Sequence, residues 1–476
     1  MKNRELMSGG NPFKTVIIFS IPSILAMLIN SIYNVVDKIF IGNYVSHEAL
    51  AGLQVVAPLT FLAFSVIVMF GLGSATYSSN KLGEKKDEEA IKIFNNSLIL
   101  SSIVVVFIML LFFIFSNFLL TLCGALPENR IYAEEYLFVL TFGFIFQSIS
   151  YFFTMNIRSE GRPLYSMFAQ ITGCVVNIVL DALFIIAFKW GVIGAALATV
   201  IGHISNFAIG LYFYVFSKKN YFTLNLKEGI KIEWKYMMQV VLIGLSSAIL
   251  NICNFVSTII YNNVIGKYTN ALSILAILTS LDALCIMPCV GIRQGLLPIF
   301  GYNYGERNYN RIFKIYGVGL IYGLFFGVMM CFTIMSFPHF FINLFVEGGE
   351  TQELIDEAVR ILRFYPIGIT IISINMNTSA LYQATRAKFK ASFLSAMRQC
   401  IYLIPLLYVL DALYGSGGVW YAMPMSDVLS AITGLFLFFT TYICYKKLGY
   451  LSIKDYRNSS RHEEQMIWWL QKSFSI

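Results

Sequence analysis

The sequence predicts an all-α integral membrane protein with twelve transmembrane helices, on the strength of three observations. Of its 476 residues 57% are hydrophobic and only 13% are charged, about half the charged fraction of a typical soluble protein. Twelve stretches reach the length of about 20 apolar residues that a bilayer core requires. Apolar residues lie on all sides of each predicted helix, and the stretches lack the alternating pattern of a transmembrane β-barrel.

The predicted spans follow one another with short connections. They are expected at 14–40, 50–79, 92–121, 132–157, 164–188, 191–216, 236–265, 271–299, 312–337, 354–381, 390–412 and 417–445. The first span is no signal peptide, because its apolar stretch exceeds 20 residues and no small-residue cleavage site follows.

The longest charged linker, 217–235, divides the chain into two lobes of six spans each, 1–216 and 236–446. A tail, 447–476, follows the last span. Its Trp468-Trp469 pair and mixed charges suggest a short interfacial helix.

The basic residues predict the orientation. Of 34 Lys and Arg residues, 26 fall in the termini and in the even-numbered loops. By the positive-inside rule we expect both termini to be cytoplasmic. The membrane is expected to be the cytoplasmic membrane of a prokaryote. The net charge of +8 is spread between apolar spans and not along one folded face, so it does not indicate a nucleic-acid partner.

The two halves contain an internal repeat. Leu82-Gly83-Glu84-Lys85 is followed 222 residues later by Tyr304-Gly305-Glu306-Arg307. Both segments fall between the second and third span of their half. Parallel repeats of this kind are typical of membrane transporters, so we expect two pseudo-symmetric six-helix lobes.

Polar side chains gather in the outer half of the first six spans. They are Asn30, Asn34, Asp37, Tyr136, Asn177, Asp181, Thr199 and His203. Ionisable residues within a span are costly and usually mark a transport path. Asp181 lies about 12 Å below the outer surface at 1.5 Å per residue, too deep for its carboxylate to reach the headgroups.

Structural alternatives stay open for most of this set. Asn30, Asn34 and Thr199 could be hydrogen-bonding contacts between helices. Asp37, near the end of its span, could extend to the headgroups beside Lys38, and His203 could be a packing residue.

Further candidates are more ambiguous. Pro22 removes a backbone hydrogen bond and permits a kink of the first span, which predicts a switch. Methionines would suit an adaptable apolar cavity, or simply pack: Met27, Met155 and Met287. In the second half the buried charges could serve transport or tie helices together: Asp282, Arg293, Arg398 and Asp427.

Motifs of other functional classes are missing from the sequence. It has no Gly-Lys-Ser/Thr phosphate loop and no hydrolase or metalloprotease motif, so we expect neither an enzyme nor an ATPase. Its eight cysteines lack metal-ligand spacing and are interpreted as apolar packing residues. Without a cofactor, the energy must come from H⁺ or Na⁺, at about 2.3 kcal/mol per 100 mV. Buried carboxylates are natural coupling groups, and they favour a cationic cargo.

Short motifs across about 10–446 resemble the multidrug and toxic compound extrusion (MATE) family, and most closely its DinF-like branch. The motifs are Ser20-Ile-Pro22, Val36-Asp37-Lys-Ile-Phe-Ile-Gly42, Arg158-Ser-Glu160-Gly161-Arg162-Pro163, Asn177-Ile-Val-Leu-Asp181, Gly194-Ala-Ala-Leu-Ala-Thr199 and Gly301-Tyr-Asn303-Tyr-Gly305.

This resemblance implies two lobes in a V shape that export cationic or amphipathic drugs in exchange for H⁺ or Na⁺. It places the ion site in the first lobe, where Asp37, Asn177, Asp181 and Thr199 would hold Na⁺ if Na⁺ is the ion, with Tyr136 beside them. It also implies bending of the first helix at Pro22.

The NorM-like branch of the family carries acidic residues in its seventh and tenth helices. Here those helices are neutral at the corresponding polar positions, which argues against a second-lobe cation site of that kind. The residues are Asn251, Asn254 and Asn262 in the seventh helix, and Asn375 and Asn377 in the tenth.

The sequence therefore predicts a monomeric secondary antiporter that contacts the bilayer and small organic cations. Three alternatives remain: a lipid-linked sugar flippase of the same superfamily, a dedicated exporter of one secreted metabolite, and a membrane receptor or scaffold. The flippase would favour basic residues in its cavity, and the repeat and buried acids count against a scaffold.

Overall fold

The structure is a computed structural model that describes residues 6–217, 220–268, 271–343 and 352–447. The predicted interfacial helix of the tail lies outside these residues. In the first half the helices are α2 (Pro12–Tyr44), α3 (His47–Gly83), α4 (Asp87–Leu122), α5 (Pro127–Ser159), α6 (Pro163–Asp181) with a π-helical continuation (Ala182–Ala187), and α7 (Gly191–Phe216).

A short helix, α8 (Leu226–Gly229), lies in the linker. The second half contains α9 (Trp234–Ile265), α10 (Ala271–Gly305), α11 (Tyr309–Ser336), α12 (Pro338–Asn343), α13 (Gln352–Leu362), α14 (Ile367–Ala384), α15 (Lys388–Ala396), a π-helical turn (Met397–Tyr402), α16 (Leu403–Tyr414), α17 (Ser416–Val419) and α18 (Ala422–Lys447).

The predicted all-α membrane fold is confirmed. In the described residues eleven helices are long and apolar enough to cross a membrane. The predicted tenth span corresponds to a bent pair, Ile355–Leu362 and Ile367–Ala384, whose axes differ by 50°. Counting this pair as one span gives twelve.

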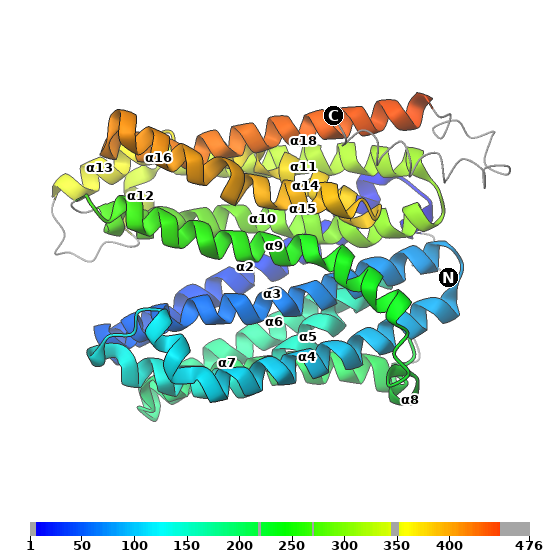
Figure 1. Cartoon of the computed structure of the whole chain (residues 1–476), viewed down its shortest axis with the longest axis horizontal. Helices are drawn as coiled ribbons and strands as arrows, with labels where there is room; N and C mark the ends of the chain where they lie inside the picture. Colours follow the sequence, from blue (N-terminus) through cyan, green and yellow to red (C-terminus); the bar gives the residue numbers. More distant parts are fainter. Residues whose placement is uncertain (1–5, 218–219, 269–270, 344–351, 448–476) are drawn as a thin grey trace.

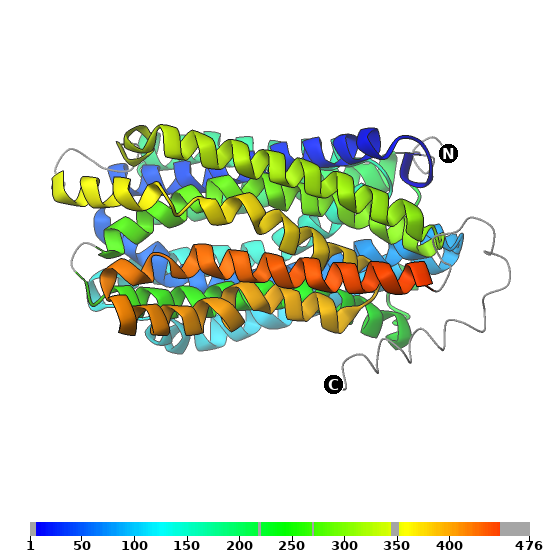
Figure 2. The same cartoon turned by 90° about the horizontal axis from the view of Figure 1, so that it is seen from above.

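Figure 1 shows two lobes, with α2–α7 in the lower and α9–α18 in the upper, and Figure 2 shows the helices nearly parallel in each. Helix α2 packs against α10, and α3 packs against α9. Each lobe thus contributes its first two helices to the seam, as a pseudo-two-fold axis requires.

Glycines 222 residues apart make equivalent contacts across this seam. A Cβ atom on Gly73 would lie 2.2 Å from the carbonyl oxygen of Val240, and one on Gly295 would lie 2.8 Å from that of Phe19. Gly83 and Gly305 meet each other, since a Cβ on either would lie 2.0 Å from a backbone oxygen of the opposite lobe. The repeat found in the sequence therefore places glycines where helices of the two lobes cross.

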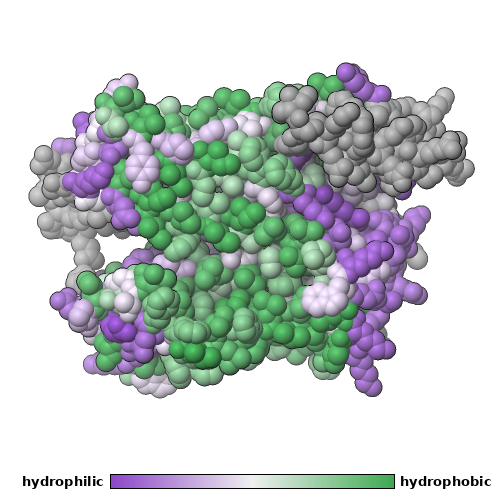
Figure 3. All heavy atoms as spheres, in the orientation of Figure 1, coloured by the Kyte–Doolittle hydropathy of each residue, from purple (hydrophilic) through white to green (hydrophobic). Residues whose placement is uncertain are grey.

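The seam is closed at one end of the molecule, which we call the basic end because Lys86, Arg307 and Arg386 gather there. The hydroxyl of Ser79 donates to the carbonyl oxygen of Pro298 at 2.7 Å, and Arg386 pairs with Glu84 at 2.9 Å. Figure 3 shows hydrophilic residues at this end and a notch between the lobes at the opposite end. The lobes thus diverge away from the basic end.

The linker between the lobes is held by side chains of the first lobe. The Asn96 amide nitrogen donates to the carbonyl oxygen of Glu228 at 3.0 Å, and its oxygen accepts from the backbone N–H of Glu233 at 3.0 Å. The carboxylate of Glu160 accepts the N–H groups of Tyr221 at 2.7 Å and Phe222 at 3.3 Å.

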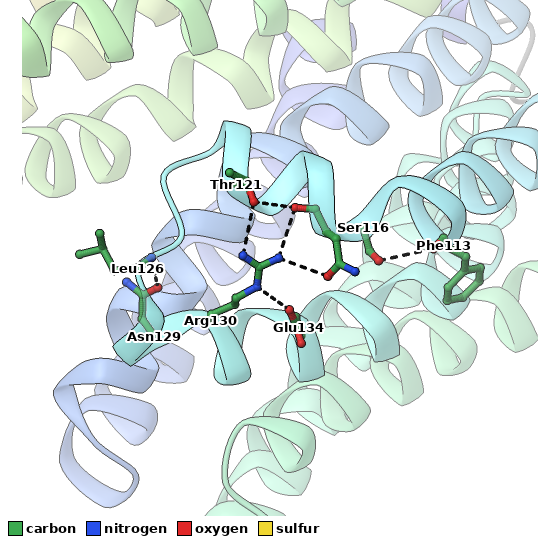
Figure 4. A network of polar contacts seen from close by, with 8 residues as sticks. Phe113, Ser116, Thr121, Leu126, Asn129, Arg130 and Glu134 are labelled. Carbon is green, nitrogen blue, oxygen red and sulfur yellow. Dashed lines mark hydrogen bonds and ion pairs between the residues drawn. The ribbon is translucent and has the colours of Figure 1, made fainter.

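At the opposite end of the first lobe, Arg130 ties α4 to α5 (Figure 4). Its guanidinium pairs with Glu134 at 2.8 Å and donates to the side-chain oxygens of Asn117 and Thr121 at 3.2 and 3.4 Å. This cation is neutralised locally, in contrast to the buried arginines of the seam described below.

Candidate functional site

Four helices of the first lobe bring the predicted ion-site residues together. Asp37 comes from α2, Tyr136 from α5, Asn177 and Asp181 from α6, and Thr199 from α7. Asp181 is completely buried and Asp37 is 8% exposed. Asp37 therefore does not extend to the surface beside Lys38, whose own side chain is exposed.

Glycines set the close approach of α6 and α7 that positions Asn177 and Thr199. A Cβ on Gly173 would lie 2.8 Å from the carbonyl oxygen of Gly202, and one on Gly202 would lie 3.1 Å from the Cβ of Asn177. At this distance the amide nitrogen of Asn177 donates to the hydroxyl of Thr199 at 3.4 Å. The π-helical turn that follows Asp181 is a distortion often found at functional positions.

Four oxygen atoms of this site are buried and have no hydrogen-bond donor among the described residues. They are Oδ1 of Asp37, both carboxylate oxygens of Asp181 and Oδ1 of Asn177. Asp37 and Asp181 lie within electrostatic range of each other. Burying two carboxylates without a counter-charge is costly, so the arrangement favours a proton or a small cation with oxygen ligands.

Tyr33 is a site residue that the sequence analysis missed. It lies one turn before Asp37 on α2, and its hydroxyl lies within electrostatic range of Asp37 and Asp181. Tyr136 lies in range of the same two carboxylates. The i, i+4 spacing from Asp37 was the available signal, but a tyrosine in an apolar span is unremarkable by itself.

The polar residues of α2 differ in exposure to solvent. Asn34 is exposed, and its amide nitrogen donates to the carbonyl oxygen of Asn30 at 2.7 Å, whereas Asp37 is buried in the lobe. Asn34 lies two turns beyond Met27, which accepts a hydrogen bond from Gln294 of the second lobe at 3.5 Å. Asn34 therefore lies outside the buried site that contains Asp37.

The remaining first-lobe candidates lie apart from the carboxylates. Pro22 is buried within a continuous α2, and His203 is half-buried on α7, one turn beyond Thr199. Of the methionines, Met27 and Met287 are half-buried. Met155 is 2% exposed and belongs to the hydrophobic core, in line with the packing alternative left open for the methionines.

Three of the four second-lobe charges form one cluster. The Nε of Arg398 donates to Asp427 in a short hydrogen bond, and its Nη2 lies 4.0 Å from Asp282. Arg398 lies in the π-helical turn before α16. Arg293 is not part of this cluster and lies instead at the seam between the lobes.

The neutral asparagines of the seventh and tenth spans bond mainly to the backbone. Asn251 donates to the carbonyl oxygen of Ser247 at 3.0 Å, and Asn377 donates to that of Gly319 at 3.2 Å. These contacts are typical of helix packing. In the described residues no group of three His, Cys, Asp or Glu side chains could hold a metal ion, and the cysteines are free.

Twelve apolar spans, a two-lobed repeat closed at one end, and a polar site inside one lobe define a multi-pass membrane transporter. Known proteins agree with this class. The sequence profile of the MatE family matches residues 22–183 and 243–409. The chain is 25% identical over 428 residues, 89% of its length, to the multidrug export protein MepA of Staphylococcus aureus strain MRSA252, and covers 93% of that protein.

Solved structures show the same fold. An outward-facing multidrug resistance MATE family transporter of the MOP superfamily superposes with a TM-score of 0.89 at 24% identity, covering 94% of this chain and 99% of the other. MATE structures described as bent and as straight give TM-scores of 0.86 and 0.88 at 23% identity, with the same coverage. The chain belongs to the MatE family, whose members are transporters and not enzymes.

Proposed function

We propose that this chain exports cationic or amphipathic small molecules in exchange for inward H⁺ or Na⁺, which binds at Asp37 and Asp181 with Asn177, Thr199 and Tyr136 beside them. One observation carries the proposal: two buried carboxylates of one lobe form no ion pair with any residue that the structure describes. The name of the related multidrug export protein supports efflux of drugs.

The charge balance of the two lobes supports this choice of site. Each lobe buries two aspartates, but among the described residues only the second lobe places an arginine, Arg398, between them. The first-lobe pair therefore needs a cation from outside the protein. A low dielectric strengthens the attraction between this pair and whichever cation enters.

We further propose that the basic end faces the cytoplasm, in agreement with the positive-inside rule. The notch of Figure 3 then opens outward. In this state an external ion would reach the first-lobe carboxylates while cargo leaves. Opening of the seam at the basic end would then release the ion into the cytoplasm.

Ethidium efflux from proteoliposomes of purified full-length protein tests the coupling. Wild-type protein is expected to move ethidium under one of two gradients applied separately, a pure Na⁺ gradient or a pure pH gradient. Asp181→Asn and Asp37→Asn remove the charge at nearly constant volume, and each is expected to abolish gradient-driven transport. Asp411→Asn is the matched control, because Asp411 is already paired with Lys267 at 3.1 Å in the other lobe.

Efflux by Asp181→Asn at the wild-type rate would contradict the coupling role. Wild-type transport that ignores both gradients would contradict antiport altogether. The gradient that drives efflux also identifies the coupling ion.

Deleting the gene separates the alternatives. An exporter of many drugs predicts increased sensitivity to several unrelated cations, and a dedicated exporter predicts loss of one secreted metabolite. Loss of a surface polymer without drug sensitivity would instead favour the lipid-linked sugar flippase.

A further inference from the structure

Two buried arginines lie at the seam between the lobes, outside the proposed cation site. Arg158 is 1% exposed and lies at the end of α5, and Arg293 is 6% exposed and lies on α10. Along the axis of α10, Arg293 lies about 18 Å before Gly305, where the seam is closed. Gln294 beside it contacts Met27, the half-buried residue that precedes the exposed Asn34 on α2. The pair thus lies at the seam between the lobes, between the Met27 contact and the closed end.

The contacts of Arg158 are all with neutral groups. Its Nη1 donates to Oε1 of Gln294 across the seam at 2.7 Å, and its Nη2 donates to the hydroxyl of Ser166 at 3.3 Å. Its Nη1 also lies 3.9 Å from the sulfur of Met155. The Nε atom is buried and has no acceptor.

Arg293 has the same kind of surroundings. Its Nη2 donates to the hydroxyl of Ser247 at 3.0 Å and to Oε1 of Gln383 at 3.1 Å. The amide nitrogen of Gln383 is a second buried donor without an acceptor. The hydroxyl of Tyr151 lies within electrostatic range of both guanidinium groups.

The charge of this cluster is uncompensated. Neither arginine forms an ion pair within the ranges 6–217, 220–268, 271–343 and 352–447. A guanidinium stays protonated in proteins, and a buried unpaired charge is costly. Two such charges with two spare N–H donors between the lobes are complementary to an anion.

We propose that Arg158 and Arg293 form an anion-binding site at the seam between the lobes, separate from the cation site of the first lobe. Its ligand carries one compact negative group, either a free inorganic anion or the headgroup of an anionic lipid. Bound there, the anion neutralises the two guanidinium groups, and it joins α5 of one lobe to α10 of the other.

Thermal unfolding of the purified full-length protein tests this site with three probes. Chloride and inorganic phosphate are titrated in neutral detergent at constant ionic strength, with a bulky sulfonate as the reference anion. In the third arm, nanodiscs of phosphatidylcholine are compared with nanodiscs that contain phosphatidylglycerol. An anion that binds only the folded protein raises the Tm in a saturable manner.

The wild type is expected to gain stability from at least one probe, which identifies the source of the anion. Arg158→Gln and Arg293→Gln are each expected to raise the half-saturating concentration about tenfold or more, since a charged hydrogen bond is lost. Arg130→Gln is the matched control and should respond like the wild type, because Glu134 already neutralises that arginine.

Crystals of the wild type grown in bromide provide a second measurement that needs no variant. If bromide binds in place of chloride, its anomalous signal is expected between Arg158 and Arg293. The proposal is overturned if no probe stabilises the wild type and no bromide lies at the pair, or if both variants respond as the wild type does. These results do not depend on whether cations are exported.

Discussion

At the scale of single residues, the two lobes differ in how the charge of their buried aspartates is balanced. Both bury a pair of aspartates inside the membrane span. The second lobe supplies its own cation, Arg398, which is bonded to Asp427 and lies near Asp282. Within the described part of the chain, Asp37 and Asp181 form no ion pair. This difference is why we propose exchange of a mobile cation in the first lobe, whereas the second lobe holds a fixed ion cluster.

This difference predicts the effect of substitutions in the fixed cluster. Arg398→Leu leaves two buried carboxylates unpaired and is expected to lower the free energy of unfolding by about 3–5 kcal/mol. Asp427→Asn keeps Arg398 beside Asp282 and should cost clearly less. Adding Asp427→Asn to Arg398→Leu should restore part of the loss. Thermal unfolding in detergent measures all three, and equal losses for both single variants would contradict the charge argument.

Glu160 predicts a pH dependence of stability. It lies in the loop between α5 and α6, and burial raises the pKa of its carboxyl to about 8, although Tyr221 and Phe222 donate backbone hydrogen bonds to it. Because the folded pKa exceeds the unfolded value, folding takes up a proton. Its stabilisation is complete below the unfolded pKa and is lost as the pH rises through about 8.

Tm values between pH 5 and pH 9 check this dependence. Glu160→Gln should flatten the decline with pH relative to the wild type, while Glu134→Gln, an exposed acid paired with Arg130, should keep it. The same slope in Glu160→Gln and the wild type would show that Glu160 does not contribute.

At the scale of elements, the helices meet where glycines allow it. Gly305→Ala is expected to destabilise the protein by about 1–3 kcal/mol, the usual cost of overpacking, because its Cβ would lie 2.0 Å from the backbone oxygen of Asn80. Gly317→Ala on α11 is the control. Its Cβ meets nothing within 4 Å, so helix propensity should stabilise it by about 0.5–1 kcal/mol. Unfolding measurements that rank the two variants in the reverse order would contradict the close packing.

The sequence predicted the spans well because length and apolar composition determine a membrane helix almost by themselves. It also predicted the grouping of Asp37, Asn177, Asp181 and Thr199, through their shared depth in the first, fifth and sixth spans. It could not predict that Arg398 joins Asp282 and Asp427, because these residues lie on three helices without a common spacing. The position of Arg293 at the seam, away from that cluster, was equally invisible, since contacts between spans depend on the rotation of each helix.

At the scale of the whole molecule, the lobes are joined at the basic end and separate at the other. The Glu84–Arg386 pair crosses the seam there, and Arg386 also stacks on Tyr77 of the first lobe, 4.8 Å from its ring centroid. The neighbouring contact between Gly83 and Gly305 depends on close backbone packing and involves no charged group. The ion pair is therefore the electrostatic component of this closure.

Reversing one charge of this pair should open the basic end. Arg386→Glu places two carboxylates across the seam and is expected to shift the closed–open equilibrium by about 1–2 kcal/mol, a factor of about 5–30. Ser79→Cys, in a background without the native cysteines, reports opening, because the Ser79 side chain is fully buried beside Pro298 of the other lobe. Its reaction with a membrane-impermeant thiol reagent added at the basic side should accelerate by that factor. Arg360→Glu makes the same charge change on the exposed surface of α13 and should leave the rate unchanged. If both reversals accelerate the reaction equally, net charge and not the Glu84–Arg386 contact holds the lobes together.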